Sequence, residues 1–152
     1  MYSAIRVVII LFALSFFSCN KSVEDFLERD IQKIEQYLVD NNLTANKTDS
    51  GLHYIIYTEG TGIKPVKQSI VEVTYKGYFL DNTVFEETQG SQTVSFRLDA
   101  VIKGWTEGLQ YFREGGNGTL LIPSKLAYGN NPPSGIPANE VLIFDIGLVD
   151  VR

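Results

Sequence analysis

The sequence predicts an α+β fold in which a curved antiparallel sheet of five to six strands wraps around one short helix, preceded by an N-terminal amphipathic helix. Two observations support this expectation. From Gly51 onward, apolar residues recur at every second position in several short segments, which is typical of half-buried strands. Only the segment around Trp105 has helical spacing there, and it is too short to be stable unless strands pack against it.

The composition is consistent with one domain and excludes several classes of function. A chain of 152 residues, 44% of them hydrophobic, can bury a substantial core. The net charge of -5 argues against nucleic-acid binding, which requires a basic surface. One Cys excludes an intramolecular disulfide, and one His leaves little material for a metal centre or a Ser-His triad. We therefore expect no metal and no cofactor.

Residues 1–18 have the features of a bacterial lipoprotein signal peptide. Arg6 supplies the basic region, and the apolar core from Val7 to Phe17 is well short of the roughly 20 residues that span a membrane. Ser18 directly precedes Cys19, as in a lipobox, although Phe16 stands where Leu is usual. We expect lipid on Cys19 to anchor the protein to a bacterial membrane, with the domain in the periplasm or at the cell surface. The alternative is an ordinary signal peptide, cut nearby, that leaves a free thiol.

Residues 19–50 are expected to form a helical stalk and a linker. Ser22 and Asp25 resemble a capping box at the start of the helix, and Asn41-Asn42 is a suitable end. An apolar stripe at three- and four-residue steps consists of Val23, Leu27, Ile31, Ile34 and Leu38. This stripe fits a helix docked on its own domain, and the alternative is a homodimer formed through residues 22–42. The polar segment 44–50 is expected to be the linker.

Residues 51–152 form the predicted domain. The expected strands are 52–57, 70–80, 83–85, 94–98, 119–122 and 141–149. Asp81-Asn82 is expected to form a turn, 86–92 a polar loop, and 130–139 a loop stiffened by prolines.

The short helix is predicted between Val101 and the glycine pair Gly115-Gly116, which is expected to end it. Gly104 is interpreted as a residue that lets the backbone turn tightly where a side chain would crowd it. Trp105, Leu109 and Phe112 have helical spacing over about nine residues. The only Trp of the chain is therefore expected on the first turn of a helix enclosed by strands.

No cluster of titratable residues suggests acid-base or nucleophilic catalysis. His53 is interpreted as a surface or edge residue, the pair Glu86-Glu87 as part of a solvated turn, and Ser124 fits no nucleophile motif. What remains is a set of aromatic residues beside turns, namely Tyr75, Phe85, Trp105, Tyr128 and Phe144. They are either all core residues, as most aromatic side chains are, or the lining of an apolar pocket.

Five segments resemble, in order and spacing, the FKBP-type peptidyl-prolyl isomerases. They are Val-Thr-Tyr75-Lys-Gly77, Val-Phe85-Glu86, Val101-Ile102-Lys-Gly104-Trp105-Thr-Glu-Gly108-Leu, Leu-Ile-Pro123-Ser-Lys-Leu-Ala127-Tyr128-Gly129 and Ile136-Pro137-Ala-Asn-Glu-Val-Leu-Ile-Phe144-Asp145. The resemblance extends from about Gly51 to Arg152. Together with the lipobox and the first helix, the chain is similar to lipoproteins of this family that are associated with gliding motility.

The resemblance implies a pocket between the sheet and the short helix, with Trp105 as its floor. The implied catalytic residues are Tyr75, Phe85, Trp105, Tyr128 and Phe144, and the implied substrate-binding residues are Glu86, Val101, Ile102 and Ile136. The Ile102 N–H and the Tyr128 hydroxyl would hold the carbonyls of the bound peptide. The implied partners are proline-containing polypeptides and macrolide inhibitors of the FKBP class.

The expected function is therefore to accelerate rotation about X-Pro bonds in exported proteins as they fold. Three departures from the family pattern leave an alternative open. Glu86 stands where Asp is usual, Val94 where the family has an aromatic residue, and the loop after Tyr128 contains Pro132-Pro133 and no His. The alternative is a non-catalytic chaperone or assembly factor that binds peptides and retains the fold.

Overall fold

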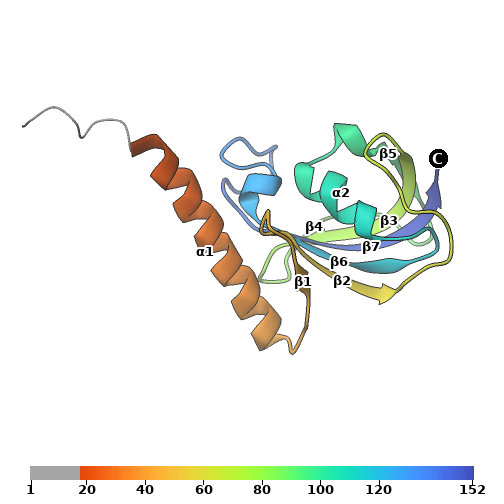
Figure 1. Ribbon diagram of the computed structural model, residues 1–152, viewed down its shortest axis with the longest axis horizontal. Coiled ribbons are helices and arrows are strands. Elements are labelled where there is room, and N and C mark those ends of the chain that lie inside the picture. Colours follow the sequence, from red (N-terminus) through yellow and green to blue (C-terminus); the bar gives the residue numbers. More distant parts are fainter. Residues whose placement is uncertain (1–17) are drawn as a thin grey trace, which may run out of the picture.

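The structure is a computed structural model that describes residues 18–152, with side chains described from residue 26 (Figure 1). The predicted signal peptide, apart from its last residue, lies outside the described residues. The elements in chain order are α1 (Ser18–Asp40), β1 (Asn46–Lys47), β2 (His53–Thr58), β3 (Ile70–Tyr78), β4 (Val84–Glu87), β5 (Val94–Arg97), η1 (Leu98–Ala100), α2 (Lys103–Gly108), η2 (Leu109–Tyr111), β6 (Asn117–Ile122), η3 (Ser124–Leu126) and β7 (Leu142–Val151), where η marks a 3₁₀-helix.

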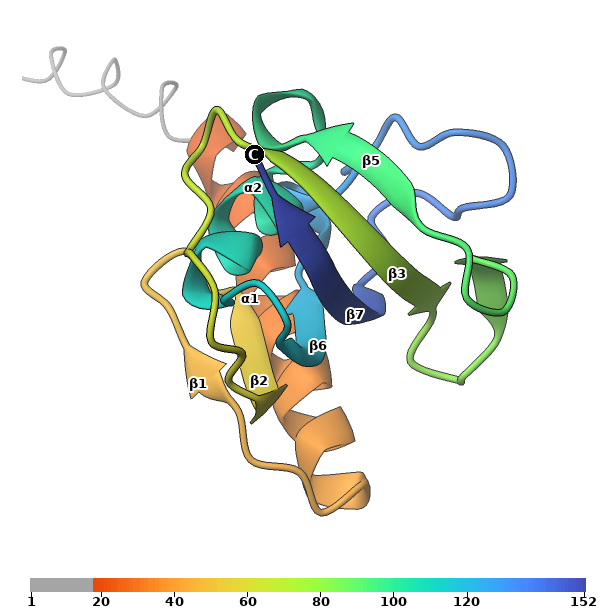
Figure 2. The same ribbon diagram turned by 90° about the vertical axis from the view of Figure 1, so that its right-hand side faces the viewer.

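All strands belong to one antiparallel sheet with the order β1-β2-β6-β7-β3-β4. β5 also pairs with β3, so that β4 and β5 share the outer edge of that long strand (Figure 2). The predicted α+β fold is confirmed, with seven strands in place of five to six. The additional strand is β1, which pairs with His53 and Tyr54 of β2 inside the segment predicted to be a linker.

The inner face of the sheet holds α2 and the main core. The core residues of this face include Leu52, Val71, Val73, Leu109, Phe112, Leu120, Ile122, Leu142 and Leu148. A Cβ atom on Gly104 would lie 2.4 Å from Ile122, and one on Gly108 would lie 2.7 Å from Leu120. The two glycines therefore allow α2 to lie directly on β6. The expectation that a side chain at Gly104 would be crowded is confirmed, although the residue lies within α2 and not in a tight turn.

The helical segment ends earlier than predicted. α2 and η2 together cover 103–111, which agrees with the expected length of about nine residues. Phe112 is already extended, with φ -81° and ψ 163°, so the helix does not continue to Gly115-Gly116. Phe112 is nevertheless buried in the core, which explains why it matched the apolar helical pattern.

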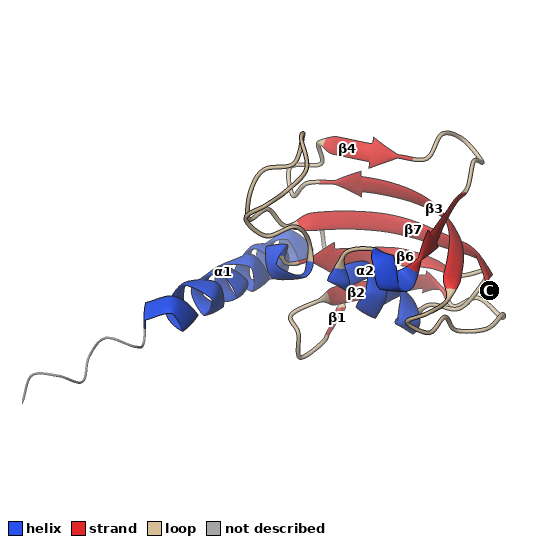
Figure 3. Cartoon of the chain, turned by 90° about the horizontal axis from the view of Figure 1, so that it is seen from above, coloured by secondary structure: helices blue, strands red, loops and turns tan. Residues whose placement is uncertain are grey.

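α1 packs its apolar stripe on its own domain. Ile34 and Leu38 are buried in a second cluster with residues from β2, β6 and β7. A Cβ atom on Gly51 would lie within 3.1 Å of both Leu27 and Ile31, so the helix also covers this glycine closely. Figure 3 shows α1 projecting from one end of the sheet, whereas α2 lies against the sheet itself. The apolar stripe of α1 is therefore docked on the domain of its own chain and is not left open for a partner.

Three local predictions were wrong. α1 begins at Ser18, so Ser22 lies inside the helix and cannot be its N-cap. Glu86 and Glu87 belong to β4, where consecutive side chains point to opposite faces, and not to a turn. His53 is buried and lies on a strand that has neighbours on both sides, so it is neither a surface nor an edge residue.

No helix among the described residues is long and apolar enough to cross a membrane.

Candidate active site

The centre of the site is Trp105, which three other rings surround. The centroids of Tyr75, Phe96 and Phe144 lie 5.3, 5.5 and 5.3 Å from the Trp105 ring, at interplanar angles of 87°, 84° and 86°. Edge-to-face packing of this kind suits the charge distribution of aromatic rings and holds the indole in one orientation. Trp105 is only 4% exposed, which fits the floor of a pocket. Its Nε1 is buried and has no acceptor among the described residues.

A glycine on β3 makes room for Phe144 and for one further ring, Phe85. Gly77 pairs with Phe144 on β7 and with Glu86 on β4. A Cβ atom on Gly77 would lie 2.7 Å from Phe85 and 2.9 Å from Phe144. The space that a side chain would fill is therefore occupied by these rings, which pack edge to face at 5.6 Å. β3, β4 and β7 together form one wall of the site.

The start of α2 supplies a backbone donor. Val101 and Ile102 are half-buried and pack against the core beside Trp105. The Ile102 carbonyl accepts hydrogen bonds from the N–H groups of Trp105 and Thr106, at 3.0 and 3.1 Å. The Ile102 N–H donates to no other described residue. Such unpaired N–H groups are expected at the beginning of a helix, and they can bind the carbonyl of a ligand.

The loop between β6 and β7 supplies the opposite rim. Tyr128 is 38% exposed, and Ile136 is half-buried against the core. Burial, and then the negative charge of Glu86, raises the pKa of Tyr128. Burial, and then the Glu86 carboxylate, raises the pKa of Tyr75 to about 12. Both phenols therefore keep their protons at neutral pH and can donate them in hydrogen bonds, and Glu86 lies close enough to affect both.

The structure brings Tyr75, Phe85, Trp105 and Phe144 into direct contact. Val101, Ile102 and Ile136 pack against the same core, and Glu86 lies close enough to Tyr75 and Tyr128 to raise the pKa of both. Trp105 and Phe144 are buried, Tyr75, Phe85, Val101, Ile102 and Ile136 are half-buried, and Glu86 and Tyr128 are exposed. This gradient from an apolar floor to a half-exposed rim is suited to receiving a small apolar side chain from a peptide. No group of three or more His, Cys, Asp or Glu side chains within residues 18–152 is placed to bind a metal ion.

A polar depression of about 400 Å³ lies on the other face of the sheet. Its lining includes Tyr57, Lys76, Glu87, Asn117 and Asp145. Asp145 already accepts hydrogen bonds from Tyr78, at 3.1 Å, and from Thr119, at 2.6 Å. Because it lacks the stacked aromatic side chains of the inner face, we place the candidate active site around Trp105.

Sequence reasoning missed Phe96, the third ring on Trp105. Val94, which stands where the family has an aromatic residue, is 40% exposed, whereas Phe96 packs against both Trp105 and Tyr75. The alternation in this segment could have found it, because β5 places Val94 and Phe96 on one face. Phe96 therefore supplies, two residues further along, an aromatic ring that position 94 lacks.

An antiparallel sheet wrapped around a short helix that begins with a buried Trp is the arrangement expected for FKBP-type prolyl isomerases. The chain belongs to the FKBP-type peptidyl-prolyl cis-trans isomerase family, because the model of that family matches residues 61–149. This is an isomerase class, and the match lies within the predicted domain.

Similar proteins support this assignment. The FKBP-type isomerase FkpA of Aeromonas hydrophila is 40% identical over 135 residues, which cover 87% of this chain and 50% of the relative. FkpA of Escherichia coli K12 is 46% identical over 109 residues, covering 70% and 40%. The crystal structure of Escherichia coli FkpA superposes with a TM-score of 0.74 at 36% identity, covering 88% of this chain and 63% of that one. A Pseudomonas syringae isomerase gives a TM-score of 0.70 at 32% identity, covering 82% and 95%.

The chain spans about half the length of the curated relatives that it matches. The similarity to FkpA therefore concerns the isomerase domain and the segment just before it.

Proposed function

We propose that this protein accelerates rotation about X-Pro peptide bonds in exported polypeptides. The observation that supports the proposal most directly is the buried Trp105 ring, with three rings edge-on around it and a half-exposed rim above. A proline side chain is apolar and compact, so it can be received by an apolar site of this kind. The membership in an isomerase family agrees with this use of the site.

The energy required is moderate. Rotation about a peptide bond breaks amide resonance and has a barrier of about 18–20 kcal/mol. The uncatalysed X-Pro step takes roughly 10–100 s. Reaching about a millisecond requires a 10⁴- to 10⁵-fold acceleration, or about 6 kcal/mol. No covalent bond to the protein is needed, which agrees with a site built from aromatic and apolar residues.

The apolar surroundings favour the twisted amide. A planar amide is strongly polar and well hydrated, whereas the twisted amide is less polar because its nitrogen lone pair is localised. Moving the bond from water into contact with Trp105, Phe85 and Phe144 therefore destabilises the planar form more than the twisted one. This is stronger binding of the transition state than of the ground state.

Two hydrogen bonds would orient the substrate. We expect the free N–H of Ile102 and the protonated hydroxyl of Tyr128 each to bind a carbonyl of the peptide backbone. Holding both flanking carbonyls confines the rotation to the X-Pro bond. The negative charge of Glu86 raises the pKa of both phenols and so keeps them protonated.

The decisive experiment is a prolyl isomerisation assay on a proline-containing peptide, with and without a macrolide inhibitor of the FKBP class. We expect turnover that the macrolide abolishes by filling the pocket. Binding of the peptide without turnover would favour the alternative, a chaperone or assembly factor that retains the fold. The exposed Val94 and the loop with Pro132-Pro133 are the departures that motivate this alternative.

The location of the protein is a further part of the proposal. Lipid on Cys19 would attach at the first turn of α1, which at about 1.5 Å per residue would act as a spacer from the membrane. The domain would then act in the periplasm or at the cell surface of a bacterium, on proteins that include those of gliding motility. Substitution of Cys19 by Ser should release the protein from the membrane fraction.

A homodimer through residues 22–42 is a weaker proposal. Leu27, Ile31, Ile34 and Leu38 are already used to dock α1 on the domain. A partner would have to bind the side of the helix that faces away from the domain, where Val39 is 70% exposed. Sedimentation of the protein at micromolar concentration would decide between monomer and dimer.

A further inference from the structure

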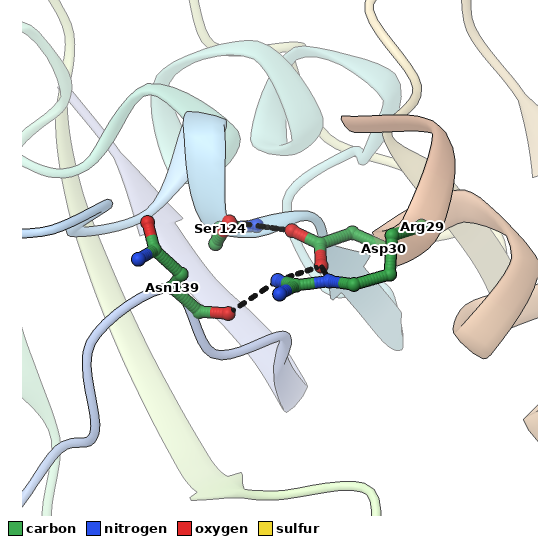
Figure 4. Close-up of polar contacts among 4 residues, drawn as sticks. All are labelled: Arg29, Asp30, Ser124 and Asn139. Carbon is green, nitrogen blue, oxygen red and sulfur yellow. Dashed lines mark hydrogen bonds and ion pairs between the residues drawn. The ribbon is translucent and has the colours of Figure 1, made fainter. Parts of the chain in front are cut away.

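An ion pair between the buried Asp30 and the partly exposed Arg29 joins α1 to both ends of the loop that carries Tyr128 (Figure 4). The Asp30 carboxylate accepts hydrogen bonds from the backbone N–H of Ser124, at 2.9 Å, and from the Ser124 hydroxyl. Its other oxygen accepts from the Arg29 guanidinium, at 2.6 and 3.1 Å. Arg29 in turn donates to the carbonyl of Asn139, at 2.8 Å. Two consecutive residues of α1 therefore contact the loop where it leaves β6 and where it approaches β7.

The loop is closed by its own hydrogen bonds at the same two places. The N–H of Gly129 donates to the carbonyl of Ser124, at 2.9 Å, and the N–H of Asn139 donates to the carbonyl of Gly129, at 2.7 Å. Gly129 directly follows Tyr128, and Ile136 lies within the part that these bonds enclose. The position of the Tyr128 side chain thus depends on Ser124 and Asn139, which are the residues that the ion pair holds.

The contacts are strong enough to fix the loop. Asp30 is fully buried, and a buried carboxylate is stable only when each oxygen has partners, as here. Ser124 is buried as well, so its N–H would lose its acceptor without Asp30. Asn139 has φ +55°, a conformation that Asn tolerates but that benefits from a fixed partner such as Arg29. Breaking a buried hydrogen bond to a charged group leaves an unsatisfied partner and is costly.

We infer that Asp30, together with Arg29, is a positioning residue for the isomerase site, and that it fixes the loop 123–139 so that Tyr128 and Ile136 face Trp105. The inference rests on the proposed function. It makes α1 part of the catalytic unit as well as a spacer, since the helix determines the geometry of the rim opposite Ile102. Neither residue touches the substrate, and both act through the loop.

The test combines hydrogen exchange with kinetics in the Asp30→Ala variant. We expect the amide protons of Gly129 and Asn139 to exchange about tenfold faster, because the loop opens locally more often. We expect kcat/KM to fall roughly 5- to 20-fold, because misplacing a contact group by a fraction of an ångström is costly. Asp30→Asn, which keeps an oxygen for the Ser124 N–H, should recover part of both effects. Glu35→Gln is the matched control on the same helix, because it removes only the exposed ion pair between Glu35 and Lys47. It should change neither the exchange rates nor kcat/KM.

A double variant distinguishes positioning from general stability. If Asp30 acts through Tyr128, adding Asp30→Ala to Tyr128→Phe should reduce kcat/KM by clearly less than it does in the wild type. Full additivity, or unchanged exchange at Gly129 and Asn139, would overturn the inference. Should Asp30→Ala not fold, Arg29→Met removes the contact with Asn139 and is read in the same way. A wild-type protein without turnover would contradict the proposed function, while the exchange measurement would still decide whether Asp30 holds the loop.

Discussion

The two faces of the sheet are built from the same strands but from different kinds of side chain. On β7, Phe144 points inward to Trp105, while its neighbour Ile143 points outward into the cluster that α1 covers. The inner face around α2 is rich in aromatic rings that meet edge to face and leave a half-exposed rim. The outer face under α1 is mostly aliphatic, and Ile34, Leu121 and Ile143 are fully buried there.

This difference separates a surface for chemistry from a surface for assembly. Aromatic rings offer large apolar areas with fixed orientation, so they can remain partly exposed and receive a substrate. Aliphatic side chains fill space densely and stabilise mainly by being removed from water. A strand that alternates between faces can serve both purposes, because substitutions on one face leave the other in place. The predictions below test that independence.

The largest effect on stability is expected from Ile34→Ala on the outer face. Ile34 is fully buried between α1 and the sheet, so its truncation should lower the free energy of unfolding by about 3 kcal/mol. Urea unfolding measures this loss. The kcat/KM of the folded molecules should stay within about twofold of the wild type, because the contacts of Asp30 are retained. Val39→Ala, at a position 70% exposed on the same helix, should change stability by less than about 0.5 kcal/mol.

The largest effect on catalysis is expected from Trp105→Leu on the inner face. Leucine retains an apolar floor but loses the flat surface and the three edge contacts, so kcat/KM should fall about tenfold or more, equivalent to at least about 1.4 kcal/mol. A peptide isomerisation assay measures it, with circular dichroism to verify folding. Phe112→Leu is the control, since Phe112 is buried in the same core but lies beyond the helix. If both variants lost activity equally, the floor would have no special role.

A smaller effect is expected from Tyr128→Phe at the rim. The substitution removes one hydroxyl from a side chain that is 38% exposed, so the melting temperature should be nearly unchanged. Losing one orienting hydrogen bond of about 1 kcal/mol should reduce kcat/KM several-fold. The assay should be run at saturating and at low peptide concentration, to show whether kcat or KM changes. An unaltered rate would remove Tyr128 from the site.

Much of the inner face could be predicted from the sequence because its pattern is local. The alternation of Val71, Val73, Tyr75 and Gly77 fixes one face of β3, and the helical spacing at Trp105 fixes the orientation of the indole. The residue that crowds position 104 could not be predicted, because it is Ile122 from a distant strand. In the same way, nothing within α1 indicates that Asp30 is buried, since its partner Ser124 lies 94 residues away.

The smallest effect concerns pH and again separates the two faces. His53, on the outer face of β2, donates a hydrogen bond from Nδ1 to the carbonyl of Gly51, at 3.0 Å, and burial lowers its pKa below the usual 6.5. The unfolded chain therefore binds a proton more readily than the folded one, so this contribution to stability is present above pH 6.5 and is lost as the pH falls through the folded-state pKa. His53→Asn should make the free energy of unfolding, measured in urea between pH 7.5 and 5, less dependent on pH than in the wild type. On the inner face, Tyr75 has a pKa of about 12, so kcat/KM per folded molecule should stay constant over the same range. A rate that followed the titration of His53 would show that the two faces are coupled through the sheet.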